Sequence, residues 1–225
     1  MHYTLHLTNN CNMQCDYCYV DKENVQVMHI STIKKVIDMA AGNSGQSQGI
    51  IFFGGEPLLC KDLIYQAIEY GRWKEKHMDT CFHFKVTTNG LLLDKQFIDF
   101  SKEYGLFIAL SHDGVAEAHN LHRKDREGKG TFEMLSEKID LLLSSHPYAP
   151  VLMTVNHDNV RYFAESVEYL YDKGFKYIIC SMNYAGKWDE ESLKILAREY
   201  NKLAEFYLRK TLAEEKFYLS PFEVK

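Results

Sequence analysis

The sequence predicts an α/β fold with parallel strands. Short apolar runs alternate six times with longer amphipathic runs, and the chemically unusual residues follow directly after the apolar runs. Such alternation is typical of repeated βα units, which form parallel sheets. The carboxyl ends of parallel strands share one edge, where binding sites are built, so we expect these residues to converge. Periodicity alone fits either an open doubly wound sheet or an arc of a barrel.

The predicted strands are short and rich in Phe, Ile, Val and Leu, as strands covered on both faces should be. They span residues 3–7, 49–53, 82–88, 106–110, 151–155 and 175–180. A predicted helix follows each strand. These helices begin near Thr32, Asp62, Lys95, Thr131, Asn159 and Asp189.

The last predicted helix has the clearest helical periodicity. Asp189 is placed to cap its N-terminus. One apolar face is expected to contain Leu193, Leu196, Ala197, Tyr200, Leu203, Ala204 and Tyr207.

Composition excludes several classes of protein. The chain has 225 residues, enough for one substantial core, with 26 Lys and Arg against 31 Asp and Glu and a net charge of −5. This weak, even charge gives no indication of nucleic-acid binding. The length predicts a single domain over residues 1–225. Because no signal peptide or membrane-spanning run is visible, we expect the protein in the cytoplasm, with no membrane partner.

Three cysteines lie within eight residues near the N-terminus. Cys11, Cys15 and Cys18 have the spacing C-x-x-x-C-x-x-C, which places three thiolates around one inorganic centre. A [4Fe–4S] cluster with three cysteine ligands keeps one iron open, whereas structural zinc sites usually have four protein ligands. A second C-x-x-C pair, typical of a zinc ribbon, is missing. The spacing therefore favours an iron–sulfur cluster over zinc.

With Tyr17 before the last cysteine, this segment resembles the signature of the radical S-adenosylmethionine (SAM) superfamily. Three further stretches resemble motifs of the same family in the same order: residues 54–57 (GGEP), 88–90 (TNG) and 111–114 (SHDG). The resemblance implies a partial (β/α)6 barrel of the TIM type. It also implies two cofactors, a [4Fe–4S] cluster held by the three cysteines and SAM bound to the open iron.

The resemblance further implies the chemistry. An electron from the reduced cluster cleaves SAM to methionine and a 5′-deoxyadenosyl radical, which takes a hydrogen atom from the substrate. The protein holds SAM and excludes water and oxygen. An external donor of the flavodoxin or ferredoxin type would supply the electron. The resemblance names no catalytic side chain.

The first motif after the cysteines is expected to contact SAM. Gly54 and Gly55 lack a β-carbon and allow close approach of backbone to a ligand, and the Glu56 carboxylate suits the amino group of SAM. A glycine turn followed by a surface glutamate is the alternative.

The remaining expected SAM contacts carry short polar or cationic side chains. A guanidinium can hold the SAM carboxylate through two parallel hydrogen bonds, while turns at Asn89-Gly90 and Asp113-Gly114 are the alternative explanation for the short side chains. These residues are Tyr17, Thr88, Asn89, Ser111, Asp113 and Arg123.

The stretch 111–132 and residues 186–188 resemble anaerobic sulfatase-maturating and ribosomal-peptide-maturing enzymes, which implies a precursor peptide or protein as substrate. Many such enzymes carry a cysteine-rich C-terminal auxiliary (SPASM) domain, and this chain has no cysteine after Cys180. We expect that domain to be absent here. Two alternatives stay open: a radical SAM enzyme for a small molecule or nucleotide, and an iron–sulfur electron carrier.

Overall fold

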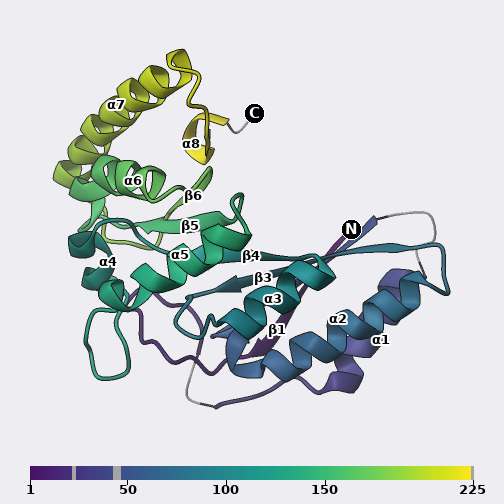
Figure 1. Cartoon of the computed structure of the whole chain (residues 1–225). Coiled ribbons are helices and arrows are strands. Elements are labelled where there is room, and N and C mark those ends of the chain that lie inside the picture. The colour runs from purple at the N-terminus through teal and green to yellow at the C-terminus, as the bar shows by residue number, and fades with distance from the viewer. Residues whose placement is uncertain (22–23, 43–46, 224–225) are drawn as a thin grey trace. The chain divides into compact units, whose positions relative to one another are not determined.

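The computed structural model describes residues 1–21, 24–42 and 47–223. Its strands form a parallel sheet in which they follow one another in sequence order, from β1 to β7 (Figure 1). The strands are β1 (His2–Thr8), β2 (Ser47–Gly54), β3 (Cys81–Thr88), β4 (Leu106–Ser111), β5 (Pro150–Val155), β6 (Tyr177–Met182) and β7 (Tyr218–Leu219).

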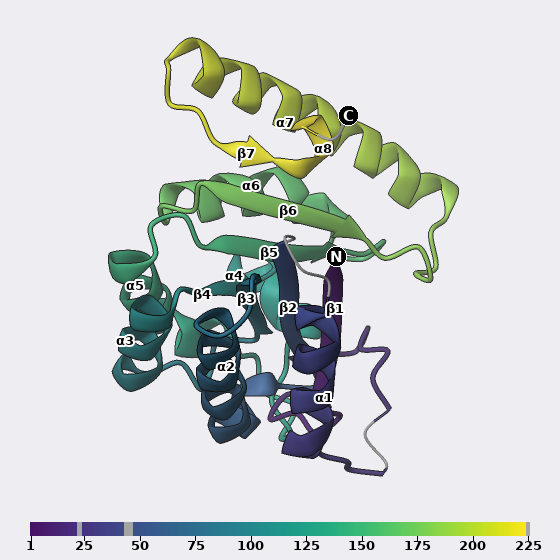
Figure 2. The same ribbon diagram turned by 90° about the vertical axis from the view of Figure 1, so that its right-hand side faces the viewer.

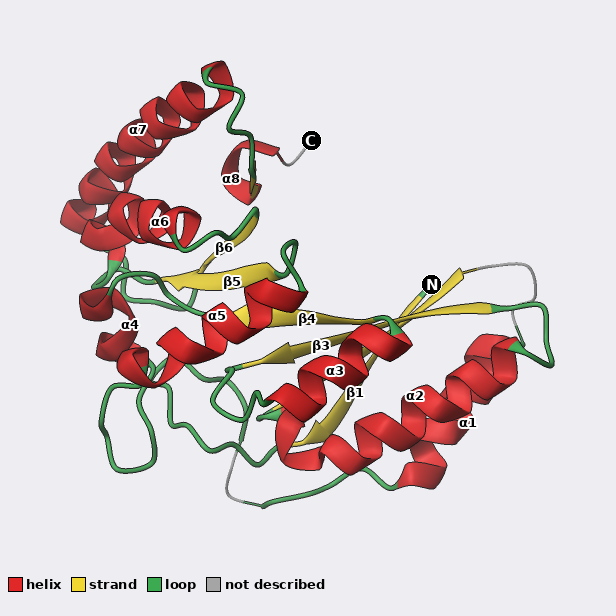
Figure 3. Ribbon diagram, viewed as in Figure 1, coloured by secondary structure: helices red, strands yellow, loops and turns green. Residues whose placement is uncertain are grey.

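Helices separate the successive strands (Figure 3). The α-helices are α1 (Ile30–Ala41), α2 (Lys61–Glu75), α3 (Lys95–Tyr104), α4 (Ala116–His122), α5 (Ser136–Ser145), α6 (Phe163–Asp172), α7 (Glu190–Leu212) and α8 (Ser220–Glu223). Short 3-10 turns precede α2, α5 and α6; these are η1 (Pro57–Cys60), η2 (Phe132–Leu135) and η3 (Val160–Tyr162).

The strand order decides between the two predicted α/β architectures. A doubly wound sheet reverses its strand order at a switch point, whereas a (β/α) barrel adds each strand beside the previous one. Here the order never reverses, which confirms the predicted parallel α/β fold of the partial-barrel type. Three short elements, α4, β7 and α8, were not predicted because each has seven residues or fewer and gives no periodic signal.

The chain divides into two compact units, and strand β4 contributes to both. The first unit comprises Met1–Asn12 and Tyr19–Ala109. Its core is aromatic: Phe52 stacks on Phe84, and Phe84 on Phe82, at centroid distances of 6.0 and 5.8 Å. Helices α1 and α2 pack side by side (Figure 2). The apolar strands thus form the buried support for the loops that follow them.

The second unit comprises Met13–Cys18 and Leu110–Lys225. Strand β7 extends the sheet by pairing in parallel with β6, Tyr177 opposite Tyr218 and Ile178 opposite Leu219 (Figure 2). No helix in the described ranges 1–21, 24–42 and 47–223 is long and apolar enough to cross a membrane.

Helix α7 begins at the predicted N-cap, but its predicted apolar face is wrong in part. The Asp189 side chain accepts a hydrogen bond from Ser192 N at 2.8 Å, completing a capping box. Leu193, however, is 52% exposed, while Glu199 is buried. The reason is polar: the Glu199 carboxylate accepts a 3.1 Å hydrogen bond from Ala164 N at the start of α6. The hydrogen bond from Ala164 N thus explains why a glutamate lies on the buried face of α7.

We predict that Glu199→Ala destabilises the protein by about 1–3 kcal/mol, because it leaves the Ala164 N–H buried without its acceptor. Urea unfolding measures the effect. Glu205→Ala is the matched control, since Glu205 is exposed on the same helix, and it should change the free energy of unfolding by less than about 0.5 kcal/mol. Equal stability of the two variants would contradict the capping role.

Candidate functional site

In the first unit, the backbone after β2 runs against the residues just before the cysteine segment, which spans residues 11–18. Gly55 N donates to Thr8 O at 2.7 Å and Glu56 N donates to Asn10 O at 2.8 Å. A β-carbon on Gly54 would lie 2.3 Å from Thr8 O, and one on Gly55 would lie 2.1 Å from Asn10 O. Glycine is thus required at both positions, because a β-carbon would collide with the neighbouring backbone of the same chain. Contact with SAM stays a prediction for both.

The Glu56 carboxylate is almost fully buried and is bound by donors of its own unit. Its Oε1 accepts from Leu58 N at 2.9 Å and from Thr88 Oγ1 at 2.7 Å, and its Oε2 accepts from Asn89 N at 2.8 Å. Burial raises the pKa of Glu56, and these hydrogen bonds oppose the rise. The carboxylate links the end of β2 to the end of β3. Glu56 is therefore not the surface glutamate that the alternative explanation expected. Its predicted contact with SAM is untested.

Thr88 ends strand β3, and Asn89 follows it beside the first cysteine. Asn89 Nδ2 lies 2.8 Å from Asn12 Oδ1 and 3.8 Å from Cys11 Sγ, and all three residues belong to the first unit. The predicted turn at Asn89-Gly90 is also present: Gly90 has a φ of 84°, and Leu91 N donates to Asn89 Oδ1 at 3.1 Å. The predicted convergence of Asn89 with a cysteine is therefore observed within this unit.

In the second unit, residues 13–18 of the cysteine segment are held by the segment that follows α4. Gln14 N donates to Lys124 O at 2.8 Å and Asp16 N donates to His122 O at 3.2 Å. The Lys124 ammonium lies 3.0 Å from the Asp16 carboxylate. Backbone hydrogen bonds and an ion pair thus hold the stretch containing Cys15 and Cys18.

Two buried side chains of the second unit, Asp113 and Arg123, form a polar network with the half-buried Tyr17. The Tyr17 hydroxyl donates to Asp113 Oδ2 at 2.6 Å. Arg123 approaches the same carboxylate twice, with Nη2 3.0 Å from Oδ1 and Nε 3.0 Å from Oδ2. Thr154 N on β5 donates to Oδ1 at 2.9 Å. Asp113 thus accepts three hydrogen bonds from its own chain, and Arg123 Nε adds a close charge contact without a fourth hydrogen bond.

The environment fixes the protonation of this network. Burial raises the pKa of Tyr17 well above its usual value, with Asp113 adding to the rise, so the hydroxyl remains a donor. Burial lowers the pKa of Arg123, but Asp113, Tyr17 and Cys15 together raise it by more than burial lowers it. The guanidinium therefore keeps its charge. The network therefore consists of a neutral phenol and a charged ion pair that includes one hydrogen bond.

The other predicted site residues are placed as follows. Ser111 is the last residue of β4 and is half-buried. None of the three motif cysteines forms a disulfide: Cys11 in the first unit is buried, and in the second unit Cys15 is half-buried and Cys18 exposed. Within residues 1–21, 24–42 and 47–223, no group of three or more His, Cys, Asp or Glu side chains is arranged to hold a metal ion.

Comparison with known proteins assigns the family. The model of the radical SAM superfamily matches residues 5–170, which include every predicted site residue. The chain belongs to the radical SAM superfamily. This confirms the predicted class of enzyme and, through the family, the predicted pair of cofactors, a [4Fe–4S] cluster and SAM.

Individual relatives differ in what their names describe. This radical SAM chain is 28% identical over 182 residues to a cysteine-type anaerobic sulfatase-maturating enzyme of Clostridium perfringens, matching 76% of the chain and 48% of the relative. It is 33% identical over 159 residues to an Fe-coproporphyrin III synthase of Methanosarcina barkeri, matching 69% of the chain and 37% of the relative. The chain thus spans half or less of each relative's length.

Among solved structures, the anaerobic sulfatase-maturating enzyme anSMEcpe with bound AdoMet and the Kp18Cys peptide has the same fold. The TM-score is 0.87 at 20% identity, over 99% of this chain and 64% of the other. At that identity the likeness supports the fold alone.

The sequence analysis missed the buried histidines that support Asp113 and Arg123. His119 Nδ1 accepts from Asp113 N at 3.3 Å, and its Nε2 lies 3.1 Å from Thr131 Oγ1, which in turn donates to Arg123 O at 3.0 Å. Burial lowers the pKa of His119 and of its neighbour His112 well below the usual value, so both stay neutral. The motif spacing from His119 to Arg123 was the one available signal.

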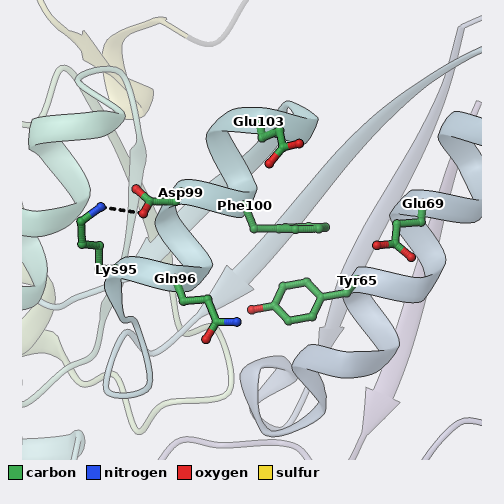
Figure 4. A pocket seen from close by; sticks show the side chains of 7 residues that line it. All are labelled: Tyr65, Glu69, Lys95, Gln96, Asp99, Phe100 and Glu103. Atoms are coloured by element: carbon green, nitrogen blue, oxygen red, sulfur yellow. Dashed lines mark hydrogen bonds and ion pairs between the residues drawn. The ribbon is translucent and has the colours of Figure 1, made fainter.

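A surface hollow of the first unit lies between α2 and α3 (Figure 4). The rings of Tyr65 and Phe100 meet there at a centroid distance of 4.4 Å, and Lys95 pairs with Asp99 at 2.6 Å. Its lining residues are Tyr65, Glu69, Lys95, Gln96, Asp99, Phe100 and Glu103. They include neither cysteine nor histidine, the ligands that iron–sulfur clusters use.

We predict that Asp113→Asn destabilises the protein by about 3–5 kcal/mol, because it leaves the buried Arg123 guanidinium without its counter-charge. Urea unfolding of the apoprotein measures this loss. Asp140→Asn, a change at an exposed position of α5, is the control and should stay within about 0.5 kcal/mol of the wild type. Tyr17→Phe should fall between the two, since it removes one hydrogen bond. An Asp113→Asn variant as stable as the control would show that the ion pair is not formed.

Proposed function

We propose that this chain binds a [4Fe–4S] cluster through Cys11, Cys15 and Cys18 and uses it to cleave SAM reductively. The supporting observation is the anchoring of the chain around the cysteines. Thr8 and Asn10, just before the cysteine segment, are hydrogen-bonded to residues 55 and 56, and Gln14, Asp16 and Tyr17 of the segment are hydrogen-bonded to residues 124, 122 and 113. The donor set suits such a cluster, because three cysteine thiolates would leave one of four irons without a protein ligand. When bound, the cluster and SAM supply a low-potential electron and a primary carbon radical.

The residues of the chain supply the setting for this chemistry. We propose that Gly54, Gly55 and Ser111 offer backbone and hydroxyl groups to SAM, and that Arg123 offers the cation for its carboxylate. Asp113 holds Arg123 in place, and Tyr17, Glu56, Thr88 and Asn89 hold the loops from which SAM is contacted. Of these side chains, Ser111 and Arg123 have the clearest capacity to bind a ligand, because both Asp113 and Glu56 already accept several hydrogen bonds.

We further propose a peptide or protein side chain as the substrate. The matched relatives that are named as sulfatase-maturating enzymes, and the structural neighbour that holds a peptide, support this class. A second candidate, a small molecule of the porphyrin kind, is favoured by the Fe-coproporphyrin III synthase relative. A flavodoxin- or ferredoxin-like donor and a reducing cytoplasmic setting belong to the proposal.

We predict that anaerobic reconstitution with iron and sulfide gives about four irons per chain, with a broad visible absorption that air removes. Replacing Cys11, Cys15 and Cys18 together by alanine should abolish iron uptake. Cys60→Ala is the matched control and should retain it, because burial raises the pKa of that thiol and disfavours the thiolate that binds iron. Iron loss in the Cys60 variant, or iron retained in the triple variant, would contradict the ligand assignment.

We predict that the reconstituted chain, reduced with dithionite, converts SAM to 5′-deoxyadenosine and methionine, and that the triple cysteine variant does not. Liquid chromatography with mass spectrometry measures both products. Adding a candidate peptide or a porphyrin to parallel reactions, and searching each for a mass change, separates the two substrate classes. An intact, reducible cluster without SAM cleavage would instead identify an electron carrier.

A further inference from the structure

Within the first unit, the Asn89 side chain is a hydrogen-bond donor directed at the sulfur of a cluster-binding cysteine. Its Nδ2 lies 3.8 Å from Cys11 Sγ and 2.8 Å from Asn12 Oδ1. A side-chain amide nitrogen has two N–H groups, so it can serve both acceptors at once. The distance to sulfur is in the range of an N–H···S contact.

The orientation of the Asn89 amide is set by its other contacts. Asn89 Oδ1 accepts a hydrogen bond from Leu91 N at 3.1 Å, and a backbone N–H can only donate. The oxygen of the amide is therefore the atom beside Leu91, and the nitrogen is the atom beside Cys11. This assignment follows from the hydrogen-bond network rather than from the similar shapes of oxygen and nitrogen.

The backbone of Asn89 is fixed as well. Its N–H donates to Glu56 Oε2 at 2.8 Å, while Glu56 Oε1 accepts from Thr88 Oγ1 at 2.7 Å. Glu56 is 1% exposed, and Asn89 and Cys11 are each 8% exposed. Burial of a hydrogen bond among apolar neighbours strengthens its electrostatic effect. Glu56 therefore holds the amide in a protected position at the sulfur.

We propose that Asn89 is a positioning residue that donates a hydrogen bond to the Cys11 thiolate and thereby raises the reduction potential of the cluster. This inference rests on the proposed function. Reduction adds one electron and increases the negative charge on the ligand sulfurs, so a donor stabilises the reduced cluster more than the oxidised one. Hydrogen bonds to the sulfurs are among the factors that set the potential of iron–sulfur clusters. Asn89 would thus ease the electron uptake that precedes SAM cleavage.

The test is a redox titration of the reconstituted protein without SAM, followed by the electron paramagnetic resonance signal of the reduced cluster. Asn89→Asp keeps an oxygen for Leu91 N but replaces the donor by an acceptor. We expect its reduced-to-oxidised ratio at a fixed potential to fall about tenfold, or about 59 mV for one electron. Asn89→Ala, which removes the donor without adding charge, should fall about threefold, since a hydrogen bond to a charged group contributes a modest net free energy.

Gln96→Glu is the matched control. It makes the same amide-to-carboxylate change in the same unit, at an exposed position of α3 (Figure 4). Its potential should equal that of the wild type. A wild-type potential in Asn89→Ala with a full cluster would overturn the proposal. Loss of the cluster from both Asn89 variants, with the control intact, would also overturn it, because Asn89 would then serve cluster assembly rather than the potential.

The outcomes for this proposal and for the proposed function are separate. If the wild-type chain takes up no iron, the proposed function is wrong, and Asn89 has no cluster whose potential it could change. A wild-type chain that binds the cluster and cleaves SAM, while all three variants share its potential, removes only the role of Asn89.

Discussion

The ion pair between Arg123 and Asp113 is the interaction on which the second unit's site depends. Both groups are buried, and a buried charge is stable only when it is paired and hydrogen-bonded. Tyr17 and Thr154 complete the hydrogen bonding of the carboxylate, which ties residue 17 of the cysteine segment to the ends of β4 and β5. Removing either charge would leave the other unpaired, so the segment carrying Cys15 and Cys18 and the cation proposed for SAM depend on one pair.

The first unit uses a carboxylate in the same way but without a counter-charge. Glu56 accepts hydrogen bonds from two backbone N–H groups and one hydroxyl, and these donors come from two loops. Burial raises the pKa of Glu56 and these donors oppose the rise, so ionisation of the group is costly and the carboxylate serves mainly to impose geometry. That geometry places Thr88 and Asn89 beside the start of the cysteine segment.

Much of the fold and part of the site could be predicted from the sequence, because their signals are local. The succession of strands and helices along the chain follows from the apolar runs, and the C-x-x-x-C-x-x-C spacing needs no tertiary information. The roles of Glu56 and Asp113 were harder to predict. Their donors, Asn89 and Thr154, are remote in sequence, and which atoms meet depends on how the strands pack. From the sequence alone, a carboxylate is interpreted as an available ligand. Only the tertiary contacts show that its oxygen atoms already accept hydrogen bonds. For the same reason Glu199, rather than Leu193, faces inward on α7.

The contacts of the Asp113 and Glu56 carboxylates matter for the chemistry of a cluster bound by thiolates. A free carboxylate in a site of low dielectric would oppose the addition of an electron to a centre already surrounded by three thiolates. Here the Asp113 charge is balanced by Arg123 and the Glu56 charge is spread over three donors, so neither presents an uncompensated acceptor. In the first unit the side chain that approaches Cys11 is a donor, the Asn89 amide, 3.8 Å from its sulfur. Under the proposed function, the acidic motif residues would serve reduction indirectly, because Glu56 fixes Asn89 in place and Asp113 holds the Arg123 guanidinium.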